Sequence, residues 1–175
     1  MIKTAVKFAL LLAAYCVLAA AGLSIVYQKT KPEIEKNKTE ILKNAMKEIL
    51  PDASTFEAKS ANVFFAFDSN RIRIGTIIKS SPRGYSGVIE LLAGLDTFNC
   101  LVAVKVISQT ETPGLGTRIS EDVFLKQFIG KNIKELGLKN DGGTIEAVTG
   151  ATVSSRAVLR GVVDGVTHPT PVKHH

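Results

Sequence analysis

Glu146-Ala-Val-Thr-Gly-Ala-Thr-Val-Ser-Ser155 is a segment that begins apolar and runs into a helical pattern. Within it, Thr149 and Thr152 flank Gly150 and Ala151, so two hydroxyl groups stand beside two residues with almost no side chain. Glycine lets the backbone turn tightly and lets a ligand approach it closely. The segment therefore predicts a hydroxyl group presented on an accessible backbone.

A helix is predicted directly after this turn, because valines recur at helical spacing over residues 158–166. Ser154 or Ser155 is expected to cap its first turn, since a serine oxygen accepts a free backbone N–H there. The free N–H groups and the macrodipole at a helix N-terminus attract anions. A phosphate near Thr152 would therefore be well placed.

Thr149-Gly-Ala-Thr152, with an acidic residue three positions earlier, resembles the flavinylation site of FMN-binding domains in the Rnf and Na⁺-translocating NADH:quinone oxidoreductase complexes. The resemblance implies that Thr152 carries covalent FMN through a phosphoester, attached by a dedicated flavin transferase. The cofactor site that it implies here includes Thr149, Gly150, Ala151 and Thr152. The acidic residue is Glu146, where that family usually has aspartate, so the carboxylate is kept. Ser154 is an alternative acceptor, and a plain capped turn is the structural alternative.

A second motif, Glu111-Thr-Pro-Gly-Leu-Gly116, predicts an irregular loop, because two glycines and a proline occur within six residues. It is similar to the other signature of the same family, although on local composition alone it reads as a turn between strand and helix. Two motifs in the family's order are more specific than either alone. The expected contacts to the flavin are Glu111 and Thr112, with the backbone N–H groups of Gly114, Leu115 and Gly116.

The first 28 residues are predicted to form a transmembrane anchor. No charged residue occurs from Phe8 to Gln28, and about 20 apolar residues of helix span a bilayer core. A cleaved signal peptide is the alternative, because Leu18-Ala-Ala-Ala-Gly22 offers the small residues that a signal peptidase prefers. The apolar pattern continues past that point to Tyr27, which favours the uncleaved anchor.

Residues 29–51 are predicted to form an amphipathic connecting helix, which starts near Pro32 and ends before Pro51. The polar and apolar pattern that follows predicts two pairs of strands. The predicted strands are residues 61–67, 71–78, 88–95 and 100–107. The sequence thus predicts an α+β fold, in which an antiparallel sheet with flanking helices forms a domain over residues 52–167. Residues 168–175 are interpreted as a flexible tail or the remnant of an affinity tag.

The composition argues against several classes of function. The 175 residues include no Trp, and the net charge of +6 is spread out, so a nucleic-acid binder is not expected. Cys16 and Cys100 are too few and too far apart for a metal cluster, so no metal site is predicted. No nucleophile–base pair or paired carboxylate appears in a defined frame. No catalytic residue is therefore predicted, and the chain is not expected to make a substrate bond by itself.

The resemblance extends from the anchor through Val166 and implies an electron-transfer subunit. It is similar to the Rnf component usually labelled G, which works in a membrane complex that links ferredoxin and NAD⁺ to ion movement. The C subunit of Na⁺-translocating NADH:quinone oxidoreductase is the alternative, but it is usually longer. A membrane-tethered scaffold or binding module without flavin is a hypothesis from a different class.

The resemblance also implies partners and a location. The partners are the other subunits of the complex, the flavin transferase and membrane lipid. The location is the cell (inner) membrane, crossed once, with the main domain outside the cytoplasm. Basic residues near the two ends of the anchor decide this orientation only weakly. The orientation therefore follows mostly from where the transferase of the resembled family works.

Overall fold

The chain begins with one long helix, α1 (Ile2–Ile49), in a computed structural model that describes residues 2–167, with side chains from residue 6 onward. Among the described residues this is the one helix long and apolar enough to cross a membrane. Pro32 lies inside α1, so the prediction that a separate helix begins there is wrong. Helix-favouring residues on both sides outweigh the cost of one interior proline, about 3 kcal/mol. The helix ends before Pro51 as predicted, and the predicted tail, residues 168–175, lies outside the described residues.

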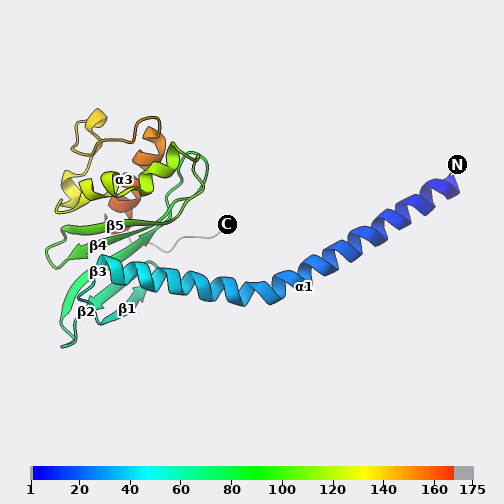
Figure 1. The fold of residues 1–175 in the computed structure, drawn as a ribbon, viewed down its shortest axis with the longest axis horizontal. Coiled ribbons are helices and arrows are strands. Elements are labelled where there is room, and N and C mark those ends of the chain that lie inside the picture. Colours follow the sequence, from blue (N-terminus) through cyan, green and yellow to red (C-terminus); the bar gives the residue numbers. More distant parts are fainter. Residues whose placement is uncertain (1, 168–175) are drawn as a thin grey trace. The chain divides into compact units, whose positions relative to one another are not determined.

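Contacts within the chain divide it into two units, residues 1–41 and 42–175. The second unit is built on one antiparallel sheet whose strand order repeats the order along the chain (Figure 1). The strands are β1 (Thr55–Ser60), β2 (Val63–Phe67), β3 (Arg73–Ser80), β4 (Glu90–Asp96) and β5 (Leu101–Ser108). Both predicted strand pairs and the α+β class are thus confirmed, whereas β1 was not predicted.

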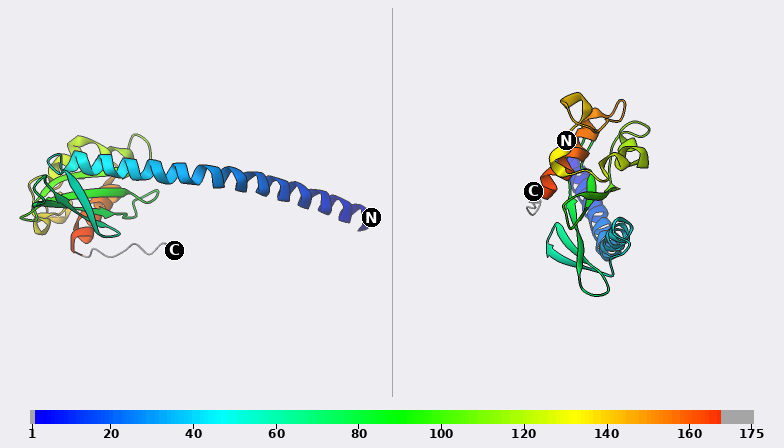
Figure 2. Two further views of the ribbon diagram at one scale, coloured as in Figure 1. Left: turned by 90° about the horizontal axis from the view of Figure 1, so that it is seen from below. Right: turned by 90° about the vertical axis from the view of Figure 1, so that its left-hand side faces the viewer.

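Both faces of the central strands β3 and β4 are buried, and they are covered by different parts of the second unit. On one face the last turns of α1 pack against Ile77 and Leu92. On the other, α3 (Thr152–Thr167) covers the sheet, and Figure 2 shows it on the opposite side from the end of α1. Neighbouring side chains of a strand point to opposite faces, so Ile77 and Ile78 belong to different cores.

Short helices between β5 and α3 pack on the same side of the sheet as α3. They are η1 (Gly116–Ser120), α2 (Asp122–Leu125), η2 (Lys126–Phe128), η3 (Ile133–Glu135) and η4 (Lys139–Asp141). Phe124 and Phe128 meet edge to face with ring centroids 5.5 Å apart, and both are buried in the core beneath α3. These helices position the loop before η1 beside the start of α3.

Candidate functional site

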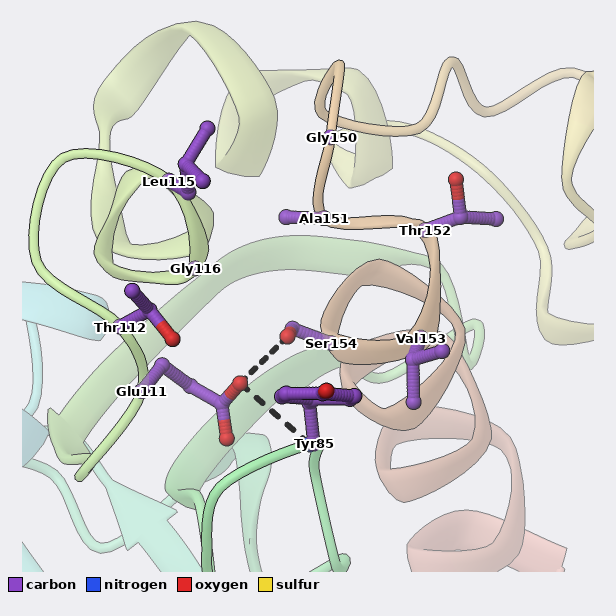
Figure 3. Close-up of a pocket in the computed structure, with 10 residues that line it drawn as sticks. All are labelled: Tyr85, Glu111, Thr112, Leu115, Gly116, Gly150, Ala151, Thr152, Val153 and Ser154. Atoms are coloured by element: carbon purple, nitrogen blue, oxygen red, sulfur yellow. Dashed lines mark hydrogen bonds between the residues drawn. The ribbon is translucent and has the colours of Figure 1, made fainter.

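A pocket of about 460 Å³ lies where three segments of the second unit meet (Figure 3). One segment precedes β4, one follows β5, and the third leads into α3. The residues that line it are Tyr85, Glu111, Thr112, Leu115, Gly116, Gly150, Ala151, Thr152, Val153 and Ser154. The structure therefore brings together all the predicted site residues except Thr149 and Gly114. Thr149 lines a smaller neighbouring pocket of about 190 Å³, and Gly114 is exposed in its loop.

A tight turn directly precedes α3. The N–H of Ala151 donates to the carbonyl of Val148 at 2.9 Å, and Gly150 has a φ of +78°. That backbone conformation suits glycine, because a Cβ would crowd the following carbonyl. The predicted accessible turn is present, and it places Thr152 at the first residue of the helix.

The helix begins at Thr152, three or four residues earlier than predicted, so the prediction that Ser154 or Ser155 caps it is wrong. Both serines lie inside its first turn and are buried. Their hydroxyls bind partners outside the cap: Ser155 accepts from the N–H of Val148 at 3.0 Å, and Ser154 donates to Glu111 at 2.5 Å. Helix assignments differ by a residue or two, but these bonds place both side chains inside the fold.

Glu111 is only 4% exposed, and its carboxylate accepts three hydrogen bonds from the protein. Oε2 accepts from the Ser154 hydroxyl and from the N–H of Tyr85 at 3.3 Å. Oε1 accepts from the N–H of Ser86 at 3.1 Å. Glu111 lines the pocket, and its three partners belong to the segments that form the pocket walls. The predicted contact of Glu111 with a cofactor stays a prediction.

Two backbone N–H groups in the loop after Glu111 donate hydrogen bonds to nearby residues of the same segment. The N–H of Gly114 donates to the hydroxyl of Thr117 at 3.1 Å, and that of Leu115 to the carbonyl of Thr112 at 3.3 Å. The expectation that these two N–H groups contact a cofactor stays a prediction. The loop presents the half-exposed side chain of Leu115 to the pocket.

The hydroxyls of Thr149 and Thr152 make no hydrogen bond with the part of the chain that the structure describes. Thr149 is exposed and Thr152 is half-buried at the edge of the pocket. Three positions before Thr149, Glu146 is held by its backbone, which exchanges two hydrogen bonds with the side chain of Gln127 at 2.7 and 3.2 Å. Its carboxylate is 70% exposed and lies 3.5 Å from Lys139. The acidic group of the motif therefore faces solvent.

Two lining residues, Tyr85 and Val153, were not predicted as site residues. Tyr85 is 75% exposed although its backbone is tied to the buried Glu111. A signal for its place lay in the sequence, because Gly84-Tyr85 with Gly87 also resembles the same family. A Cβ on Gly84 would collide with Oε1 of Glu111. Glycine there lets the Tyr85 loop approach the carboxylate.

Comparison with known proteins identifies the family. Residues 84–167 match the FMN-binding domain, and residues 1–49 match the RnfG N-terminal region. The G subunit of the ion-translocating oxidoreductase complex of Methanosarcina acetivorans is 33% identical over 154 residues, which cover 81% of this chain and 82% of that protein. The G subunit of the proton-translocating ferredoxin:NAD(+) oxidoreductase complex of Clostridium ljungdahlii is 30% identical, with 89% of this chain and 86% of that protein covered.

Among solved structures, NqrC of Shewanella oneidensis is similar with a TM-score of 0.50 and 21% identity, covering 66% of each chain. At that identity the likeness concerns the fold alone. The two G-subunit relatives, by contrast, align over more than four fifths of their own length. The chain therefore belongs to the RnfG family, the G subunits of ion-translocating oxidoreductase complexes, and it contains that family's FMN-binding domain.

Proposed function

We propose that Thr152 carries FMN through a phosphoester, and that the chain relays electrons as the G subunit of a membrane-bound ferredoxin:NAD⁺ oxidoreductase complex. The observation that carries this proposal is the hydroxyl of Thr152, a residue that lines the pocket. It stands on the first residue of α3, free of hydrogen bonds to the described residues.

The neighbouring hydroxyls are less suitable acceptors. Ser154 is 2% exposed and already donates to Glu111, and Ser155 is fully buried between two backbone partners. Thr149 is exposed but lies outside the pocket that Thr152 lines. Thr152 is thus the hydroxyl that combines access with a cavity for the attached group.

The surroundings of Thr152 fit a flavin nucleotide. The start of α3 supplies unpaired backbone N–H groups and the positive end of the helix macrodipole, both of which favour a phosphate. Tyr85, Leu115 and Val153 give the pocket exposed apolar side chains that an aromatic ring system can contact. FMN, when bound, accepts and releases one or two electrons, which suits a relay between carriers of different electron count.

The membrane part of the proposal rests on α1. Residues 1–28 are the proposed anchor, which crosses the cell (inner) membrane once, and the FMN-binding domain lies outside the cytoplasm. The family and the named relatives support a place among the other subunits of a membrane complex. We further propose that a flavin transferase recognises the exposed segment around Glu146 and Thr149. The chain makes no substrate bond by itself in this scheme.

The proposal is tested by the intact mass of the full chain, extracted from membranes of cells that contain the transferase. Wild type should carry the added mass of FMN as a phosphoester, located by peptide fragmentation on Thr152. Thr152→Ala should lose it, whereas Thr149→Ala and Ser154→Ala should keep Thr152 as the acceptor. An unmodified wild-type chain would instead favour a membrane-tethered scaffold, and flavin on Ser154 would reassign the acceptor.

A further inference from the structure

The buried carboxylate of Glu111 connects three segments that are far apart in the sequence. Its partners Tyr85 and Ser86 lie 26 and 25 positions earlier, and Ser154 lies 43 positions later. Figure 3 shows the hydrogen bonds from Ser154 and from Tyr85 to Glu111. One side chain therefore connects the loop that carries Tyr85 with the first turn of α3, which begins at Thr152.

The packing around Glu111 leaves it little freedom to move. A Cβ on Gly116 would lie 2.7 Å from Cβ of Glu111 and 3.1 Å from its Oε2, and one on Gly84 would meet Oε1. The side chain thus occupies a slot between two glycines. Because bulkier residues at either glycine would displace it, the slot fixes where the carboxylate oxygens stand.

The carboxylate of Glu111 is stabilised by hydrogen bonds from uncharged donors. Among the described residues no ion pair to Glu111 occurs, and its oxygens accept from two backbone N–H groups and one hydroxyl. A buried carboxylate strongly requires such donors, and hydrogen bonds to an ionised acceptor are stronger than neutral ones. Losing Glu111 would therefore release all three donors together.

The loop that carries Tyr85 depends on these bonds. The loop closes on itself, through Gly84 N–H to Gly87 carbonyl at 2.7 Å and Ile89 N–H to Pro82 carbonyl at 2.9 Å. The Tyr85 side chain is mostly exposed and does not anchor the loop. The two N–H bonds to Glu111 thus hold the tip of the loop against the rest of the domain.

We propose that Glu111 is a positioning residue, which sets the separation between the Tyr85 loop and the first turn of α3 and so fixes the flavin ring in its pocket. It acts through Tyr85, Ser86 and Ser154 rather than by touching the cofactor. The flavin part of this inference rests on the proposed attachment at Thr152. The hydrogen-bonding part stands without it.

The test compares full-length wild type, Glu111→Gln and Ser154→Ala in lipid nanodiscs. Glutamine keeps the size of Glu111 but replaces one acceptor oxygen with a donor, and alanine at position 154 removes the hydroxyl while favouring the helix. Glu135→Gln is the matched control, because Glu135 is an exposed carboxylate outside the pocket. Amide hydrogen exchange is measured on peptides that contain Tyr85 and Ser86.

Glu111→Gln should speed exchange at Tyr85 and Ser86 about tenfold, the effect of losing one hydrogen bond to a charged group. Ser154→Ala should speed it by a smaller factor, and the control should match wild type. In molecules whose mass confirms full FMN occupancy, both pocket variants should lower flavin fluorescence anisotropy and weaken the visible circular dichroism. A general loss of stability would speed exchange throughout the domain instead.

Unchanged exchange at Tyr85 and Ser86 in both variants would overturn the inference, as would unchanged anisotropy at full occupancy. If Glu111→Gln does not fold, amide exchange and flavin anisotropy in Ser154→Ala test the inference. If wild type carries no FMN, the proposed function fails. The exchange measurement still decides whether Glu111 holds the Tyr85 loop.

Discussion

The Ser155 hydroxyl accepts a hydrogen bond from the N–H of Val148 at 3.0 Å and donates one to the carbonyl of Ala151 at 2.9 Å. A single buried hydroxyl thereby ties both ends of the turn before α3 to the first turn of the helix. The turn that precedes Thr152 is therefore held by a buried side chain of α3, that of Ser155.

Ser155→Ala should destabilise the domain by about 1–3 kcal/mol, because it leaves the partly buried N–H of Val148 without its partner. Thermal unfolding followed by circular dichroism measures the loss. Ser120→Ala, at an exposed position, is the control and should change little. Equal stability of the two variants would mean that the turn does not depend on Ser155.

Gly150→Ala should cost about 1–2 kcal/mol, because an L-residue with a side chain disfavours the left-handed backbone observed there. The added Cβ would also lie 3.1 Å from Cδ2 of Leu115. Gly150→Asn should cost less, since asparagine tolerates this conformation better. Chemical unfolding of both variants checks the order, and a reversed order would show that space rather than backbone strain limits the position.

The folded domain should begin near Leu42 rather than at residue 52. Met46 is 3% exposed on the sheet, and the end of α1 covers the fully buried Ile77 and Leu92. A fragment of residues 42–167 should unfold cooperatively, whereas residues 52–167 should aggregate or unfold without a clear transition. Met46→Ala in the full chain should cost about 2–5 kcal/mol, while Ile41→Ala, at a side chain that is 51% exposed, should be nearly neutral. Equal behaviour of the two fragments would contradict this boundary.

Glu146→Gln should slow FMN attachment without destabilising the fold, because its carboxylate is exposed and only its backbone is tied to Gln127. Glu146→Asp should attach FMN at least as fast as wild type, since it keeps the charge. Time courses of FMN incorporation with the transferase, beside thermal unfolding, separate recognition from stability. A slower rate accompanied by a lower melting temperature would point to the fold instead.

The central strands were predicted well, because β3 and β4 are rich in apolar residues and both of their faces are buried. The first strand, β1, was not predicted because it lacks such a buried apolar run. Every position of β1 except Phe56 is exposed, so its sequence carries no alternation. It lies at the edge of the sheet and pairs with β2 alone, and its place depends on backbone pairing rather than on burial.

The two motifs located most of the pocket, because few residues at fixed spacing suffice to shape a turn and a loop. The start of α3 was misjudged, since Ser154 and Ser155 look like caps when only neighbouring residues are considered. Ser154 is engaged by Glu111 across 43 positions. Long-range partners of this kind follow from the tertiary fold and cannot be read from local sequence.

The sequential strand order lets each strand find its neighbour within a short stretch of chain, and such low contact order favours rapid folding. The pocket lacks this locality, because its walls meet only after the last helix has docked. The sheet can thus assemble early while the site matures late. A chain that bears FMN on Thr152 would therefore be one that had finished folding. Attachment of FMN would then distinguish folded from unfolded chains before the protein joins its complex.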